Sequence, residues 1–583
     1  MRFSPLLFVG ALAVAPATAQ RATLASTPLR APTRALALTG ATVVTAPGDT
    51  LRQATVVVRD GRIERVGAGL AVPTDAERID ADSLWVYAGF VDAFSYAGVA
   101  EPEDADEDDP EDPDAPSRTR AGIQPERDVR ALYDPSAGSV GALRMAGFGA
   151  AHVVPRGGML PGRSALVLLG DPRPNDPQAA ARQVLQGDAG LVATFETASG
   201  VYPNTPMAVI AAFRQLARET ARRGEADALY AEAPAGRPRP DYDAGADALR
   251  PALGGDRPLY FQTDGPLDAF RALSLADEFG FSTVLVGLPD AAPLLPRLDG
   301  RGGAVFAPLA LPKRPDADSA ATDSSAVPSE PQAGEPGGAT FASSRRTLSY
   351  ADLDDETADL QAKRTASIQA REASPARLAA ADVPFAFATL DVKAADVLPN
   401  LRRFVTAGLP RSSALAALTT APAALLGVSG SLGTIEAGKL ANLVVTDRDL
   451  FADSAAVRMV IVEGEVFEAE SGPDGADPDA VVDAAGTWAV TATSPQGQST
   501  GTMTIAGSAD ALTGRLRVPD VGVDAELDDV ELRGNVLTFT FTIEGAGRVR
   551  VSGVVTGDEY EASADVPGMG SLPFQATKQP DAR

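Results

Sequence analysis

The chain contains no cysteine and a single histidine, His152, in 583 residues. The absence of cysteine excludes a disulfide framework and any thiolate metal site. Lysine is also rare, and arginine supplies nearly all of the basic charge. The five lysines are Lys313, Lys363, Lys393, Lys439 and Lys578. Apolar runs long enough to span a bilayer are missing as well, so we predict no membrane span.

Acidic residues outnumber basic ones by 78 to 51, which gives a formal net charge of −27. Nucleic-acid phosphates would be repelled by such a chain, so a nucleic-acid partner is not expected. The excess charge instead keeps the surface hydrated and the protein soluble. With 45% apolar residues and this length, the chain can form large cores in roughly three domains.

Residues 1–19 have the features of a secretory signal peptide. Arg2 gives a short positive region, an apolar stretch follows, and Ala17-Thr18-Ala19 fits the small-x-small cleavage rule. We therefore predict that the mature protein is periplasmic or secreted. An ordinary apolar N-terminus is the alternative.

The rest of the chain divides by pattern into four parts. Residues 36–87 read as short strands, with a hairpin turn at Asp60-Gly61. Residues 88–426 alternate between strand and helix patterns, which is typical of a parallel sheet wound open or closed into a barrel. Strands return at 427–468. Residues 485–580 form short alternating runs separated by glycine turns, which predicts an antiparallel all-β domain of about eight strands.

Two segments of the alternating part have no periodicity. Residues 101–117 form an acidic loop, with ten acids and three prolines in the first fourteen positions. A calcium site is the alternative interpretation, although the regular ligand spacing and central glycine of a calcium loop are missing. Residues 314–346 are rich in Ser, Ala, Pro, Asp and Gly, and we predict a flexible insertion there.

The segment at 85–98 reads WVYAGFVDAFSYAG. It has the frame of the first barrel strand of amidohydrolases, P-G-F-[IV]-D-x-H-x-H. Residues 40–93, 146–169 and 414–451 resemble the opening sandwich, the second barrel unit and the closing segment of the same superfamily, in its imidazolonepropionase-like branch. The resemblance covers about 36–468.

This resemblance implies the following fold: a (β/α)8 TIM-type barrel, a composite β-sandwich from both flanks, and beyond them the small all-β domain. The sandwich would consist of 36–87 and 427–468, and the barrel of 88–426. The C-terminal domain is loosely similar to lipocalin-like tails.

The resemblance also implies chemistry that needs a metal. Family members hold one or two divalent ions, usually zinc, which lower the pKa of bound water and so generate hydroxide for attack on C–N bonds. Four histidines, an aspartate and, in two-metal members, a carboxylated lysine supply the ligands. In this chain the histidine positions hold other residues, namely Phe94, Tyr96, Gln262 and one of Val286, Gly287 or Leu288. Leu390 occupies the aspartate position, with Asp391 one residue later, and no lysine precedes Lys313. We therefore expect no zinc and no other cofactor, because a lone carboxylate does not hold zinc in competition with water.

Several polar residues remain as candidates at the strand ends. The catalytic candidates are Asp391, Asp264 and His152, and the binding candidates are Tyr96, Arg156 and Gln262. Each has a structural alternative. His152 can be a packed core histidine, and Arg156-Gly157-Gly158 can be a turn with a surface arginine. Asp264 and Asp391 can cap helices or belong to a satisfied polar cluster.

We expect a degenerate amidohydrolase, a pseudoenzyme that acts as a partner or ligand-binding protein. The partner would be an active relative, and the ligand a small molecule in the barrel mouth. One alternative is a metal-independent hydrolase that uses Asp391 and Asp264. Another is a binding module that works through the C-terminal β domain.

Overall fold

The protein is described here from a computed structural model. The described residues are 35–102, 113–171, 183–298, 303–314, 350–390, 392–453, 455–469, 480, 482–494, 497–508, 511–519, 522–543, 547–566 and 570–579. The predicted leader, most of the acidic loop and nearly all of the insertion at 314–346 lie outside them. Among the described residues, no helix is long and apolar enough to cross a bilayer.

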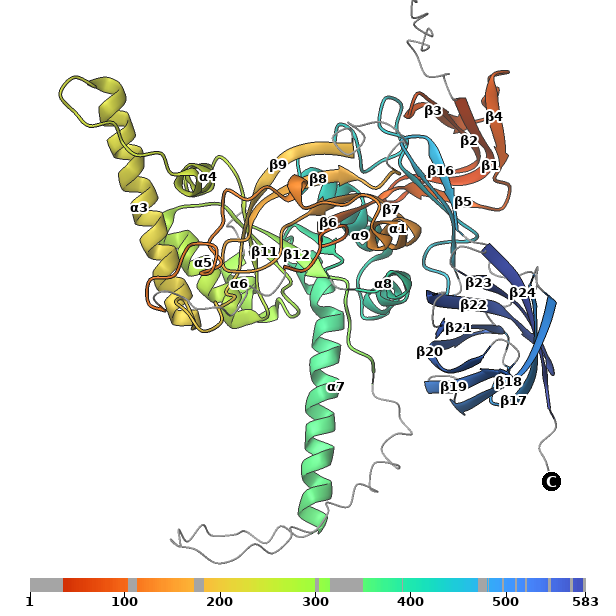
Figure 1. Cartoon of the computed structure of the whole chain (residues 1–583). Helices are drawn as coiled ribbons and strands as arrows, with labels where there is room; N and C mark the ends of the chain where they lie inside the picture. Colours follow the sequence, from red (N-terminus) through yellow and green to blue (C-terminus); the bar gives the residue numbers. More distant parts are fainter. Residues whose placement is uncertain are drawn as a thin grey trace, which may run out of the picture.

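Strands from both flanks of the chain share one eight-stranded sheet (Figure 1). Its strands are β1 (Ala35–Ala46), β2 (Asp49–Arg59), β3 (Arg62–Ala68), β4 (Ala76–Asp80), β5 (Trp85–Ala88), β14 (Leu443–Thr446), β15 (Val457–Val462) and β16 (Glu465–Glu468). Antiparallel pairing of β14 with β5 joins the two flanks. Asp60 and Gly61 form the turn between β2 and β3, with φ of 52° and 75°, as a tight hairpin turn requires. The N-terminal strands thus depend on a segment more than 350 residues away.

A second eight-stranded sheet, here called the main sheet, carries the alternating part of the chain. Its strands in spatial order are β6 (Phe90–Ser95), β7 (Phe148–Val153), β8 (Gly162–Leu168), β9 (Val184–Ala193), β10 (Leu259–Gln262), β11 (Thr283–Val286), β12 (Ala304–Pro308) and β13 (Phe385–Ala388). Neighbouring strands are parallel except at β8, which is antiparallel to both β7 and β9.

The expectation of a regular (β/α)8 barrel is therefore wrong at β8. The chain returns from β7 through the turn at residues 154–161 and not through a helix. Gly158 lies in this turn with φ of 83°, and a Cβ there would collide with the backbone of Gly122. The apolar sequence of β8 does not indicate whether this strand is parallel or antiparallel to its neighbours, because a buried strand has the same residue pattern in both cases.

The edge strands β6 and β13 of the main sheet meet at their carboxyl ends. The backbone N–H of Leu390 donates to Phe94 O at 3.3 Å, and Ser95 forms a parallel bridge with Leu390. The Asp92 carboxylate accepts from the backbone N–H of Thr389 at 2.9 Å and from its hydroxyl. The sheet therefore encloses an interior, lined by apolar side chains from β6 to β13.

Helices cover the outside of the main sheet. They are α1 (Gly138–Met145), α3 (Pro206–Glu232), α4 (Ala244–Leu253), α5 (Pro266–Phe279), α6 (Leu295–Leu298), α7 (Tyr350–Ala380), α8 (Val397–Thr406), α9 (Arg411–Leu418) and α10 (Thr420–Leu425). A large apolar core fills the space between helices and sheet. The far half of α3 and the first part of α7 extend away from this body (Figure 1).

The C-terminal part is a closed antiparallel barrel of eight strands, which confirms the predicted all-β domain. The strands are β17 (Gly486–Ser494), β18 (Gly497–Ser508), β19 (Ala511–Val518), β20 (Val523–Arg533), β21 (Val536–Ile543), β22 (Gly547–Thr556), β23 (Glu559–Val566) and β24 (Gly570–Lys578). Trp488, Phe539 and Tyr560 are fully buried in its core. The Trp488 indole donates to Ala484 O at 3.0 Å and the Tyr560 hydroxyl to Leu537 O at 2.8 Å, so both polar groups are satisfied.

Candidate functional site

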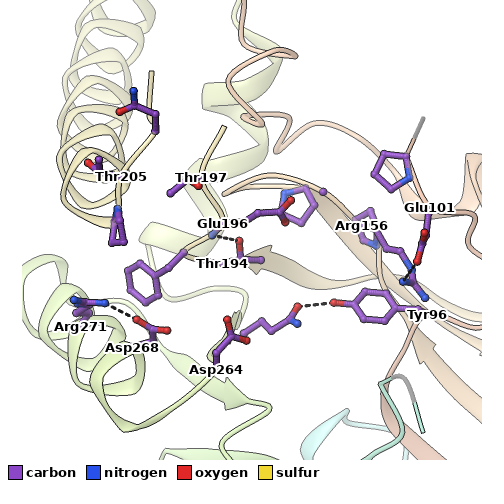
Figure 2. A pocket seen from close by; sticks show the side chains of 18 residues that line it. Tyr96, Glu101, Arg156, Thr194, Glu196, Thr197, Thr205, Asp264, Asp268 and Arg271 are labelled. Atoms are coloured by element: carbon purple, nitrogen blue, oxygen red, sulfur yellow. Dashed lines mark hydrogen bonds and ion pairs between the residues drawn. The ribbon is translucent and has the colours of Figure 1, made fainter. Parts of the chain in front are cut away.

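A pocket of about 800 Å3 opens where several strands of the main sheet end (Figure 2). Its wall is formed by segments that follow β6, β7, β9 and β10, together with the first turns of α3 and α5. In sheets of this kind the residues beyond the carboxyl ends of parallel strands build the site. The lining residues are Tyr96, Glu101, Pro102, Pro155, Arg156, Gly157, Pro161, Thr194, Phe195, Glu196, Thr197, Asn204, Thr205, Pro206, Gln262, Asp264, Asp268 and Arg271.

Four of the six residues singled out from the sequence line this pocket. Tyr96 directly follows β6 and Gln262 is the last residue of β10. The two side chains meet, because the Tyr96 hydroxyl donates to Gln262 Oε1 at 2.5 Å. The guanidinium of Arg156 lies over the Tyr96 ring, 4.0 Å from its centroid, and contacts Glu101 at 3.3 Å. The pair formed by Tyr96 and Gln262 is the floor of the pocket on the side of the sheet interior.

Asp264 is exposed at the pocket and lies two residues after β10. Helix α5 does begin nearby, at Pro266, but its N-cap residue is Gly265 and no side chain caps it. The helix-cap alternative for Asp264 is therefore wrong. The neighbouring carboxylate of Asp268, in the first turn of α5, is paired with Arg271 at 2.6 Å.

Glu196 and Phe195 also line the pocket and were missed from the sequence. They follow β9, whose sequence VLQGDAGLVA contains two glycines and an aspartate and does not resemble a regular strand. Phe195 packs on Phe261 with ring centroids 4.7 Å apart. The recognisable signal is short: Glu196 follows the apolar residues Leu191–Ala193 at a distance of three positions in the sequence.

His152 lies elsewhere, fully buried in the interior of the main sheet. Its Nδ1–H donates to Ala93 O at 2.7 Å, because a carbonyl can only accept. Nε2 is 2.7 Å from Ser164 Oγ and accepts from it in the neutral ring. Burial lowers the pKa of His152 to about 4. The histidine is thus a neutral, doubly bonded core residue and does not line the pocket.

Asp92 is a second buried ionisable group that the sequence analysis did not single out. It is fully buried on β6, and burial raises the pKa of its carboxyl to about 6. Hydrogen bonds from Thr389 and from the backbone N–H of Phe94, at 3.2 Å, oppose this rise. Asp92 therefore fastens β6 to the end of β13 beneath the pocket.

Comparison with known proteins identifies the fold. The sequence profile described as Amidohydrolase family matches residues 353–467. An amidohydrolase from Thermotoga maritima superposes with a TM-score of 0.57 at 19% identity, covering 74% of this chain and 100% of that one. Residues 353–467 therefore match an amidohydrolase family model, and the fold of the chain is similar to that of a solved amidohydrolase.

Two other solved structures are similar over a comparable share of the chain. A Xaa-Pro dipeptidase is 13% identical and covers 75% of this chain and 100% of its own, with a TM-score of 0.39. A molinate hydrolase is 16% identical and covers 77% of this chain and 99% of its own, also with a TM-score of 0.39. No curated protein matches the chain.

The residues present do not fit the metal that the amidohydrolase fold implies. Phe94 has no exposed surface and packs edge-on against His152, with ring centroids 6.0 Å apart. Leu390 packs against the same interior, and its Cδ1 lies 3.7 Å from where a Cβ on Gly287 would be. Apolar residues thus stand at three of the positions where the resemblance implies metal ligands, and Tyr96 and Gln262 stand at two others. No group of three His, Asp or Glu side chains that could hold an ion occurs within the described ranges.

Asp391, the remaining catalytic candidate, lies outside the described residues. Its neighbour Leu390 has a φ of 49°, which is unusual for a branched side chain. The structure thus brings Tyr96, Arg156, Gln262 and Asp264 to one pocket and places His152 beneath it.

Proposed function

We propose that this amidohydrolase, of the imidazolonepropionase-like branch, has lost the family's metal chemistry and binds a small organic ligand at the mouth of the main sheet. It acts outside the cytoplasm, because the leader at 1–19 has the features of a secretion signal. The observation that carries the proposal is the apolar filling of the family's metal position around Phe94.

A metal site cannot be rebuilt in this interior by a small movement. The one histidine of the chain uses both ring nitrogens within the core. Phe94 packs against its ring, and Tyr260 lies 4.5 Å from it by ring centroids. Replacing this contact by an ion would need polar ligands that these positions do not offer.

The pocket above the interior supports ligand binding, because it has the size and the mixture of lining groups that small-molecule sites share. It contains aromatic, hydroxyl, amide, carboxylate and guanidinium side chains. The core of the C-terminal barrel is filled by Trp488, Phe539 and Tyr560, which supports a scaffold role for that barrel more than a cavity for a ligand.

The experiment is metal analysis combined with hydrolysis assays. The mature protein is purified from zinc-supplemented medium, its metal content is measured, and amides, dipeptides and cyclic ureas are assayed with zinc and with chelator. A zinc-dependent amidohydrolase serves as the positive control. We expect metal far below one ion per chain and no zinc-dependent turnover.

Stoichiometric zinc together with zinc-dependent turnover would contradict the proposal. Turnover that resists the chelator, disappears in Asp264→Asn and survives in Asp268→Asn would instead favour a metal-independent hydrolase. Co-purification with an amidohydrolase that retains its histidines would favour a partner role.

A further inference from the structure

We propose that the pocket takes an organic cation, specifically an alkylammonium group attached to an aliphatic chain. This inference rests on the proposed function, since it names the ligand class of the same pocket. A free diamine and a lysine side chain of a peptide share this chemistry, and the experiment below separates them.

The first argument is the charge balance of the lining. Six charged side chains face the pocket, four acidic and two basic. Both arginines are already paired, Arg156 with Glu101 at 3.3 Å and Arg271 with Asp268 at 2.6 Å. Asp264 and Glu196 remain, both exposed, and neither has a hydrogen-bond or ion-pair partner for its carboxylate within the described part of the chain. The pocket therefore presents two uncompensated negative charges.

Two helix N-termini at the pocket oppose this charge but do not cancel it. Helix α3 begins at Pro206 and α5 at Pro266, and each N-terminus is equivalent to about half a positive charge. The Thr205 hydroxyl already accepts from Ala208 N at 3.1 Å. The four acidic and two basic lining side chains sum to a net charge of −2, and the two N-termini together offset only about half of it. The net charge of the pocket lining therefore stays negative.

The second argument is apolar surface in the lining. Phe195 contributes an aromatic wall, and Pro155, Pro161 and Pro206 also line the pocket. A ligand with an aliphatic chain beside its ammonium group would cover these side chains and gain from their burial. A bare inorganic cation would not.

The experiment is calorimetric titration of the full mature chain with a matched set of probes. The set comprises putrescine, n-butylamine, butanediol, succinate, and the peptide acetyl-Ala-Lys-Ala-amide. We expect putrescine to bind about tenfold or more tightly than butanediol, with succinate weakest, because each exposed ion pair contributes up to about fivefold. Affinity should fall as salt is added. Tighter binding of the peptide than of n-butylamine would identify a protein lysine as the source.

Variants locate the site. Asp264→Asn and Glu196→Gln should each weaken putrescine about three- to fivefold, and together about tenfold or more. Glu225→Gln is the matched control, since this exposed acid of α3 makes the same charge change away from the pocket. Thermal unfolding confirms that each variant is folded.

The outcomes separate this inference from the proposed function. If succinate or butanediol binds more tightly than putrescine, and this binding is lost when lining residues are substituted, the pocket binds a ligand that is not a cation. This result would contradict the present inference and support the proposed function. Failure of every probe would overturn both. An equal loss of affinity in Glu225→Gln would show a general charge effect and would also overturn the site.

Discussion

The interior of the main sheet and the pocket at its mouth share the same strands but are built from opposite residue types. Below the Tyr96 and Gln262 pair, the rings of His152, Tyr260 and Phe306 fill the space, with Tyr260 and Phe306 stacked at 5.6 Å. Above the pair, six charged side chains line an open pocket. The hydrogen-bonded side chains of Tyr96 and Gln262 form the boundary between the two regions. Stability and binding should therefore be separable by substitution on either side of it.

The largest loss of stability is expected for a substitution in the interior, below the Tyr96 and Gln262 pair. Phe94→Ala should lower the free energy of unfolding by about 3–5 kcal/mol, because a fully buried ring leaves a cavity. The two tryptophans of the chain, Trp85 and Trp488, lie in different units. Urea unfolding followed by fluorescence in a Trp488→Phe background therefore reports through Trp85, which packs against the large core of the main sheet. Phe94→Leu, which keeps most of the volume, is the control and should cost less.

Putrescine affinity should change little in Phe94→Leu. A loss of binding there that equals the loss in Asp264→Asn would mean that interior and pocket act as one unit, and the comparison would fail.

His152 should give the interior an acid-sensitive component. Its folded-state pKa of about 4 lies below the ordinary value of 6.5, so between these pH values the unfolded chain binds a proton that the native ring does not. Stability is then lost as pH falls from about 6.5 to about 4, by about 3 kcal/mol. Because the chain has one histidine, its Cε1–H resonance can be followed alone by NMR. A midpoint near the ordinary value would contradict the buried, neutral assignment.

Asp92 should make the stability depend on pH in the opposite direction, over nearly the same pH range. Its folded-state pKa of about 6 lies above the ordinary 3.8, so the stability it contributes is present below about pH 4 and lost as pH rises through about 6, by roughly 3 kcal/mol. Asn in this place imitates the protonated carboxyl. Asp92→Asn should therefore gain stability relative to the native chain as pH rises from about 4 to about 6, measured by urea unfolding. A difference that is independent of pH would refute this account.

The sequence located the strand ends better than the strand directions. The resemblance of residues 85–98 to the first barrel strand of amidohydrolases placed Phe94 near the end of β6 and Tyr96 directly after that strand, as the structure has them. The antiparallel course of β8 was not predictable, since direction depends on the length and shape of a connection and leaves no mark on a buried apolar run.

The candidate site was predictable where polar residues follow apolar strands and not where the strand is irregular. Gln262 and Asp264 follow the clear strand LYFQ. Glu196 follows β9, which changes register against β8 and carries glycine at its centre. Asp92 was hidden for another reason: its role depends on Thr389, which is 297 residues away and approaches only when the sheet closes.

A substitution in the Tyr96 and Gln262 pair itself should change stability and binding least. Tyr96→Phe removes the hydrogen bond to Gln262 but keeps the ring beneath Arg156. We expect a loss of about 1 kcal/mol in stability, the usual net value for one hydrogen bond, and little change in putrescine affinity.

A double-mutant cycle with Gln262→Met isolates that bond. If the hydroxyl and the amide stabilise the chain mainly through each other, the double variant should lose less than the sum of the two single variants. Purely additive losses would mean that each group is satisfied independently, by water or by other neighbours. The pair would then no longer define where the packed interior ends and the binding pocket begins, and the division between the two regions would have to be placed at Phe94.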